Sequence, residues 1–170
     1  MEVLAIIPAR GGSKGIPMKN LSILNDKPLL FYTINAAFNS KYITRTIVST
    51  DHEDIASYAQ QMGAEIIKRP RNLSGDKIAI EPIMSHVLCH LKKEDYKPEL
   101  IILLQNTSPL RTAKHIDESI VLLRKKKFDS ILSVSKSHHL FWAKHNLKAS
   151  PINYNPLKRP NRQQMKNQFV

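Results

Sequence analysis

Short aliphatic runs alternate with amphipathic segments along most of this chain, and this alternation restricts its fold more than any other feature. The pattern predicts strands near residues 2–8, 45–50, 64–67, 99–104 and 130–135, and helices near 28–39, 52–62, 80–93 and 112–126. Strands that alternate with helices indicate parallel strands joined by helical crossovers. The uninterrupted apolar runs LAII and LIILL indicate strands buried on both faces. We therefore expect an α/β fold with a mostly parallel sheet.

Three residues suggest where helices begin and end. Pro28 suits the first turn of a helix, because the N–H it lacks would have no helical partner there. Asp51 is placed to cap the helix at 52–62, and Gly63 is placed to end it. From about residue 136 onward the periodicity fades, and we expect extended loop or edge structure there.

Length and composition favour a single domain over residues 1–170. The chain is 42% hydrophobic, which is enough for one core but leaves little room for a second. No apolar run approaches the roughly 20 residues that span a bilayer, and the N-terminus lacks the pattern of a signal peptide. The single cysteine, Cys89, cannot form an internal disulfide. We expect a cytoplasmic protein without a membrane partner.

The net charge of +12 first suggests a nucleic-acid partner. Its distribution argues against one, because residues 130–170 contain seven Lys and Arg residues and no acid, and so contribute +7 of the total. A basic region of this kind is typical of one half of a structure whose acidic complement lies elsewhere. We therefore expect no nucleic-acid partner.

The first predicted strand leads directly into a loop rich in glycine and positive charge, in the stretch IIPARGGSKGIPMKN at 6–20. Small residues let a ligand approach the backbone N–H groups, and Arg10, Lys14 and Lys19 add charge that suits a polyphosphate. The loop is neither a Walker A motif nor a Gly-x-Gly-x-x-Gly motif. From the residues alone, a phosphate-binding loop and a solvated glycine-rich turn both stay open.

The stretch IIPARGGSKGIPMKN resembles the N-terminal signature of the acylneuraminate cytidylyltransferases, also called CMP-sialic acid synthetases. TINAAFNS, IVSTD, KRPRNLSGD, LLQNTSPLRT and RQQ at 162–164 match the family in the same order. The resemblance covers essentially the whole chain and implies a three-layer Rossmann-like nucleotidyltransferase fold. It also implies transfer of CMP from CTP to a nine-carbon sialic-type acid, with N-acylneuraminate, legionaminate and pseudaminate all open as acceptors. A cytidylyltransferase for the eight-carbon acid of lipopolysaccharide is an alternative.

The resemblance also implies roles for residues of the first loop. Nucleotide binding falls to Arg10, Ser13, Lys19 and Asn20, with Lys14 as an additional cation. Negative charge builds on the departing pyrophosphate during nucleotidyl transfer, and fixed cations stabilise it. We expect Arg10 and Lys19 to be the catalytic residues.

Later positions are carried over from the family one by one. Arg69 and Asp76 would bind the nucleotide, although GDKI at 75–78 departs from the family's Ser-Asp-Thr-Ala, and an ordinary surface loop stays open for Asp76. Gln105 and Arg162 would contact the sugar acid. Arg111 is open between a site residue and a structural cation that pairs with a neighbouring helix.

Several tempting groups have a simpler explanation. His86, Cys89 and His90 lack an acidic third ligand, and a helical histidine without a metal is the more common case. The cations at 124–127 suit the last turn of a helix. His138, His139 and Trp142 could line the sugar pocket or merely pack.

The family continues beyond RQQ with an Asn-Gly motif, a dimer-forming portion and an Asp-x-Asp pair that holds catalytic Mg²⁺. The 170 residues contain none of these, so we expect a domain that is incomplete at its C-terminus and that forms a homodimer when complete. Three hypotheses stay open: part of an active cytidylyltransferase, a truncated and catalytically inactive nucleotide-binding module, and a basic nucleic-acid-binding protein. The arrangement of strands and helices disfavours the third.

Overall fold

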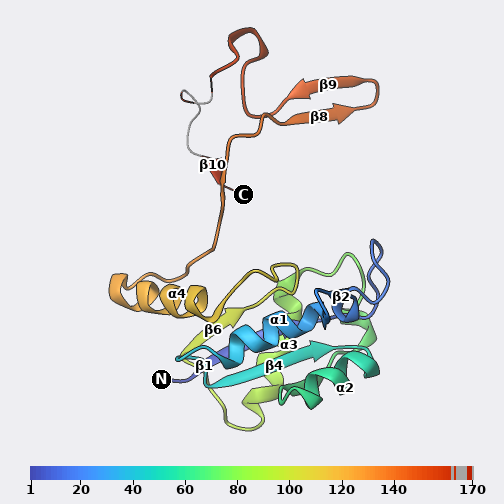
Figure 1. The fold of residues 1–170 in the computed structure, drawn as a ribbon, viewed down its shortest axis with the longest axis vertical. Coiled ribbons are helices and arrows are strands. Elements are labelled where there is room, and N and C mark those ends of the chain that lie inside the picture. Colours follow the sequence, from blue (N-terminus) through green and yellow to red (C-terminus); the bar gives the residue numbers. More distant parts are fainter. Residues whose placement is uncertain (162, 164–167, 170) are drawn as a thin grey trace. The chain divides into compact units, whose positions relative to one another are not determined.

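The computed structural model describes residues 1–161, 163, 168 and 169. The chain divides into two compact units, Met1–Lys127 and Phe128–Val170, called here the N-terminal and C-terminal units (Figure 1). The prediction of a single domain over the whole chain stays a prediction. No helix among the described residues is long and apolar enough to cross a membrane.

The N-terminal unit is built on a parallel four-stranded sheet in the order β5-β4-β1-β6. Its strands are β1 (Val3–Pro8), β4 (Arg45–Thr50), β5 (Glu65–Lys68) and β6 (Leu100–Leu103). Its helices are α1 (Leu29–Phe38), α2 (Glu53–Gln61), α3 (Ile80–Lys92) and α4 (Ala113–Lys126). These elements confirm the predicted α/β class, and their bounds differ from the predicted ones by at most one residue.

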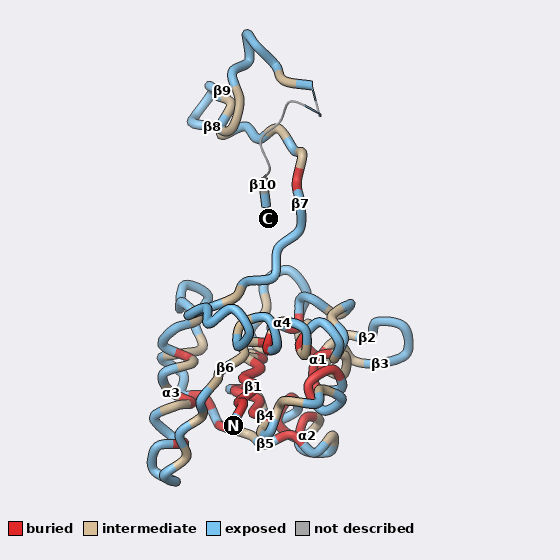
Figure 2. Tube along the Cα trace, turned by 90° about the vertical axis from the view of Figure 1, so that its left-hand side faces the viewer, coloured by how far each residue is buried: buried red, intermediate tan, exposed pale blue. Residues whose placement is uncertain are grey.

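The helices pack on both faces of the sheet, which gives three layers. Apolar residues of α1, α2 and α4 form one cluster with Val3, Ala5 and Ile7 of β1. Val87 and Leu91 of α3 form the other cluster with strand residues of the opposite face. Figure 2 shows the buried residues gathered along β1 and β4 and on the helix faces turned toward them. The predicted three-layer fold is confirmed.

The two apolar strands differ in burial. Every residue of β1 from Val3 to Ile7 is buried, as predicted for a strand covered on both faces. β6 does not fit that prediction, because Ile101 is 40% exposed. Within the described residues β6 pairs only with β1 and lies at the edge of the sheet. An edge strand keeps one side open, and this explains the difference.

The predicted ends of α1 and α2 are partly right. Pro28 is the N-cap of α1, one residue outside the helix. The N-cap of α2 is His52, whose ring nitrogen accepts a hydrogen bond from Asp54 N, so the prediction of Asp51 was wrong. Gly63 follows α2 with φ of +90°, a conformation that glycine adopts without a steric penalty.

Short elements complete the N-terminal unit. A small hairpin joins β2 (Ile23–Leu24) and β3 (Lys27–Pro28), and Asn25 and Asp26 form its turn with positive φ. The 3₁₀ helices η1 (Lys19–Leu21) and η2 (Arg71–Leu73) follow β1 and β5 in the chain.

The C-terminal unit consists of short antiparallel pairs. β7 (Lys136–Ser137) pairs with β10 (Gln168–Phe169), and β8 (Trp142–His145) forms a hairpin with β9 (Lys148–Pro151). The 3₁₀ helix η3 (Pro156–Lys158) follows. This arrangement agrees with the extended structure predicted beyond residue 136.

The strand predicted at residues 130–135 does not form. The segment has no regular structure, and Leu132 is 81% exposed. A strand requires a neighbouring backbone to complete its hydrogen bonds, and none of the described strands pairs with this segment. The local pattern of apolar residues was therefore insufficient to predict it.

Candidate functional site

A pocket of about 260 Å³ lies where the chain leaves the carboxyl ends of β1, β5 and β6. In open parallel sheets ligands bind at this edge. The pocket is lined by Pro8, Arg10, Ser13, Lys19, Asn20, Arg69, Gly75, Asp76, Ile78, Ile80, Ile83, Gln105, Asn106 and Thr107. It thus brings together every predicted site residue except Lys14 and Arg162. Lys14 reaches the pocket through Asp76, and Arg162 lies outside the described residues.

The loop after β1 is tied to the end of β4 by its backbone. Ala9 N donates to Ser49 O at 2.9 Å, and Gly11 N donates to Asp51 Oδ1 at 3.0 Å. Asp51 therefore holds the loop rather than capping α2. A Cβ on Gly11 would lie 2.6 Å from His52 Cδ2, so only glycine fits this close approach.

Two cations of the loop meet one carboxylate. Arg10 Nη1 lies 2.8 Å from Asp76 Oδ1, and Lys14 Nζ lies 2.8 Å from Asp76 Oδ2. The hydrogen bond from Lys14, together with the charge of Arg10, holds the pKa of Asp76 below its ordinary value. Lys19 forms no salt bridge with the described residues. Among the described residues that line the pocket, the cations Arg10, Lys19 and Arg69 therefore accompany one carboxylate, Asp76.

Arg69 is a buried residue of the pocket lining. Its side chain is 95% buried, its Nη2 donates to Ser49 O at 2.6 Å, and its Nε donates to Ser49 Oγ at 3.2 Å. Burial lowers the pKa of Arg69, while the nearby Asp51 partly offsets that effect. Arg69 Nη2 and Ala9 N thus donate to the same carbonyl, that of Ser49. This carbonyl joins β4 to the loop after β1 and to the segment after β5.

Two buried amides fix the start of the loop. Asn106 Nδ2 donates to Asn20 Oδ1 at 2.9 Å and to Pro8 O at 3.4 Å, and Asn20 Nδ2 donates to Arg10 O at 2.9 Å. The two carbonyls accept only, so they fix the orientation of both amides. Asn106 Oδ1 is then left buried without a donor.

Asn106 is the pocket residue that sequence reasoning missed. The available signal was its place directly after Gln105 at the end of a predicted parallel strand, beside the loop that follows the first strand. Asn20 was predicted to bind nucleotide, and in the structure both ends of its amide are used within the protein.

Gln105 is exposed at the pocket rim, and Arg111 lies behind it. Arg111 Nη2 donates to Gln105 O at 2.9 Å, and burial lowers the pKa of Arg111. Arg111 forms no salt bridge with the described residues, so the interpretation of a cation paired with a neighbouring helix was wrong. Its Nη2 holds the Gln105 carbonyl, and its Nη1 is buried without a hydrogen-bond partner.

The described residues do not provide a metal site. They contain no group of three or more His, Cys, Asp or Glu that could hold an ion, and this includes His86, Cys89 and His90 of α3. The pocket carboxylate, Asp76, is already engaged by two cations. In nucleotide sites Mg²⁺ is held by one or two carboxylates together with substrate phosphates. Among the described residues that line the pocket, the one carboxylate is paired with cations, so no free carboxylate is offered there to the metal that the resemblance implies.

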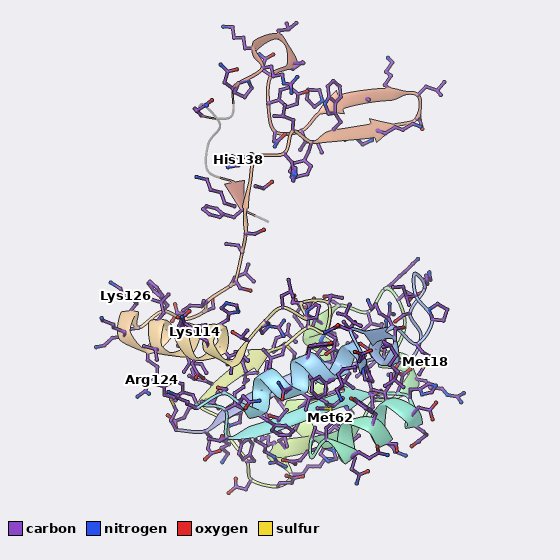
Figure 3. All side chains as sticks on the ribbon, in the orientation of Figure 1. Met18, Met62, Lys114, Arg124, Lys126 and His138 are labelled. Carbon is purple, nitrogen blue, oxygen red and sulfur yellow. The ribbon has the colours of Figure 1, made fainter. Side chains whose placement is uncertain are left out.

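The pocket lies far from the basic end of α4. Figure 3 shows Met18, the residue before η1, at one end of the N-terminal unit and Arg124 and Lys126 at the other. Arg124, Lys125 and Lys126 occupy the last turn of α4, as predicted for cations near a helix C-terminus.

Comparison with known proteins agrees with this geometry. A family model described as Cytidylyltransferase matches residues 4–170. The chain belongs to the cytidylyltransferase family. N-acylneuraminate cytidylyltransferase A of Danio rerio is 36% identical over 166 residues, which cover 95% of this chain and 38% of that protein. N-acylneuraminate cytidylyltransferase of Escherichia coli O18:K1:H7 (strain RS218 / NMEC) is 41% identical over 138 residues, covering 81% and 32% respectively.

The cytidylyltransferase chain thus spans about a third of the length of these relatives. Among solved structures, CMP:2-keto-3-deoxy-manno-octonic acid synthetase complexed with CTP matches with a TM-score of 0.63 at 21% identity, over 75% of this chain and 49% of that one. 4-Diphosphocytidyl-2C-methyl-D-erythritol synthase of Anaerococcus prevotii matches with a TM-score of 0.61 at 17% identity, over 99% and 68%. These likenesses support the nucleotidyltransferase fold.

Proposed function

We propose that this chain forms the nucleotide-binding part of an N-acylneuraminate cytidylyltransferase. The proposed reaction transfers CMP from CTP to a sialic-type nonulosonic acid and releases pyrophosphate. The observation that carries the proposal is the pocket at the strand ends, where Arg10, Lys14 and Lys19 gather around a glycine-rich backbone. The similar proteins named N-acylneuraminate cytidylyltransferase support a sialic-type acid as the substrate class.

The proposed chemistry is an attack on the α-phosphorus of CTP by the anomeric hydroxyl of the sugar acid. The bond from the α-phosphorus to the bridging oxygen breaks, pyrophosphate leaves with that oxygen, and the hydroxyl proton is lost to a base. Negative charge then grows on the leaving group. Arg10 and Lys19 would act as the catalytic residues by stabilising that charge, because fixed cations need no rearrangement during the reaction.

The other residues of the first loop would bind and position the nucleotide. Ser13 offers a hydroxyl at the pocket wall, and Lys14 offers an exposed ammonium beside it. Asn20 would act indirectly, because its amide holds the Arg10 carbonyl. Arg69 would likewise hold the floor of the pocket. Asp76 would influence nucleotide binding through its ion pairs with Arg10 and Lys14, because its carboxylate and a phosphate group would repel each other in direct contact.

Gln105 would contact the sugar acid, because its exposed amide lies at the rim of the same pocket. Arg162 stays a proposed sugar-acid contact. N-acylneuraminate is favoured over legionaminate and pseudaminate by the names of the relatives alone. Mg²⁺, a homodimer and a cytoplasmic location belong to the same proposal for the complete protein.

A second candidate is a catalytically inactive nucleotide-binding module. The observation that favours it is that the described residues contain no group of three or more His, Cys, Asp or Glu that could hold a metal ion. The two candidates agree on the nucleotide site and differ in turnover.

A pair of assays separates them. CTP binding to the 170-residue chain is measured by calorimetry. Pyrophosphate release is measured for this chain and for the complete protein with CTP, ATP, GTP and UTP, each with N-acetylneuraminate, legionaminate or pseudaminate and Mg²⁺. Selective CTP binding by the chain with turnover by the complete protein supports the first candidate, and CTP binding without turnover by either form supports the second. Stronger binding to polynucleotide than to CTP, falling steeply with salt, would contradict both.

A further inference from the structure

The pocket contains an anion that belongs to the protein itself. Asp76 is the pocket's carboxylate, and it lies between two cations of the first loop, with one oxygen 2.8 Å from Arg10 and the other 2.8 Å from Lys14. Hydrogen bonds between ionised groups are stronger than neutral ones. Asp76 therefore occupies the side-chain donors that a phosphate group would use.

This position is difficult to reconcile with direct nucleotide binding by Asp76. A carboxylate beside a triphosphate adds repulsion between like charges. The low pKa of Asp76 means that the group remains ionised at neutral pH. A polyphosphate that reaches Arg10 and Lys14 must separate them from Asp76.

The carboxylate of Asp76 joins its segment to the first loop through two ion pairs. Three backbone hydrogen bonds run within residues 70–78, from Leu73 N to Pro70 O, from Ser74 N to Arg71 O and from Ile78 N to Gly75 O. Ser74 Oγ also donates to Pro70 O. Withdrawal of Asp76 would leave these local bonds intact.

We propose that Asp76 is an internal counter-ion that competes with polyphosphate for Arg10 and Lys14 and thereby sets the affinity of the phosphate site. The proposal rests on the function proposed above. In the free protein Asp76 pairs with both cations and offsets one of their two positive charges. An incoming triphosphate displaces it, because several phosphate oxygens with multiple charges compete against one carboxylate.

The same competition assists the release of pyrophosphate. After transfer, pyrophosphate is no longer joined to the nucleoside and keeps only its contacts with the cations. Asp76 then competes for Arg10 and Lys14 from within the chain, where its effective concentration is high. The carboxylate thus weakens the binding of both the substrate and the leaving group.

The alternative is that Asp76 holds Arg10 and Lys14 in the geometry that binds phosphate. The two roles predict opposite signs. Removing a competitor tightens the binding of polyphosphate, whereas removing a support for the cations weakens it.

The test compares Asp76→Asn with the unaltered 170-residue chain in calorimetric titrations of inorganic tripolyphosphate, pyrophosphate and CTP. D76N removes two ion pairs, each of which contributes only weakly because it is exposed. We therefore expect D76N to bind tripolyphosphate about tenfold more tightly, and not by several orders of magnitude. The gain should shrink in high salt, which screens exposed charges. Pyrophosphate should become a correspondingly stronger inhibitor of CTP binding.

Asp95→Asn is the matched control, because Asp95 pairs with Lys97 at 3.0 Å and does not line the pocket. Asn tolerates the positive φ of 54° at this position. D95N should bind tripolyphosphate as the unaltered chain does. If D76N fails to fold, Asp76→Ser removes the charge with a smaller side chain and should give the same result.

Equal or weaker binding of tripolyphosphate by folded D76N overturns the counter-ion role and leaves the proposed function in place. Failure of the unaltered chain to bind either CTP or tripolyphosphate overturns the phosphate site itself, and the counter-ion role with it. The two failures are therefore distinguishable in one set of titrations.

Discussion

The buried amide pair makes a prediction about stability that depends on a single unpaired atom. Replacing Asn106 with Leu removes the donors to Asn20 Oδ1 and Pro8 O, and it also removes the acceptor Oδ1, which has no donor in the structure. Replacing Asn106 with Asp removes the same donors, keeps the acceptors and places a charge at a position that is 4% exposed.

The expected magnitudes follow from these contacts. Losing the donor to the buried Asn20 Oδ1 costs about 1–3 kcal/mol, losing the donor to the part-buried Pro8 O costs less, and removing the unpaired Oδ1 of Asn106 returns about 1 kcal/mol. N106L should therefore lower the free energy of unfolding by about 2 kcal/mol. N106D should lower it by about 4 kcal/mol, because an unpaired buried charge adds its own penalty.

The assay is urea unfolding at neutral pH, followed by far-UV circular dichroism. All four α-helices of the described residues lie in the N-terminal unit, so the helical signal reports on that unit. Trp142 lies in the C-terminal unit, and its fluorescence reports on that unit separately. Unfolding of N106D at the same urea concentration as N106L would refute the assignment of the amide orientations. A change of less than about 0.5 kcal/mol in both would refute the role of the pair.

Two further outcomes follow from the contacts of single residues. Gly11→Ala should weaken CTP binding measured by calorimetry, because its Cβ would meet His52 Cδ2 at 2.6 Å and overpacking of this kind costs about 1–3 kcal/mol. Adding His52→Ala should restore part of the lost affinity, and no recovery would contradict the clash. Hydrogen bonds from Thr44 and Tyr96 lower the pKa of Glu2, so its stabilising effect is present above the ordinary pKa and is lost as the pH falls through the lowered value. The unfolding midpoint of Glu2→Gln should then differ from that of the unaltered chain at pH 6 and converge with it as the pH falls below the ordinary pKa of a glutamate, and a constant difference would argue against the effect.

Much of the fold followed from local patterns. The apolar runs and the glycine and proline positions predicted four helices and four strands of the N-terminal unit, because each element has the period that burial of one of its faces requires. The strand predicted at 130–135 failed because strand formation depends on a neighbour that the local sequence does not reveal. β6 has the same apolar composition as β1, and only the sheet order makes it an edge.

The candidate site was predictable in its residues and less so in their roles. The place of Arg10, Lys19 and Gln105 at strand ends followed from the order of elements. The partners of Asp51 and Asp76 did not, because both carboxylates pair with groups distant in sequence. Asp51 looks like a helix cap locally, yet Gly11 N competes for its oxygen. Long-range competition of this kind is settled by tertiary geometry.

The central claim is that the loop after β1 binds polyphosphate, and calorimetric titration with CTP tests it most directly. The test chain carries Arg10→Gln and Lys19→Gln. The control carries Arg124→Gln and Lys126→Gln, which remove the same charge at the far end of the N-terminal unit (Figure 3). We predict that the first pair weakens CTP binding by about a hundredfold or more, since two charge-assisted contacts are lost, while the control remains within about twofold. Equal affinities in the two variants would contradict the account.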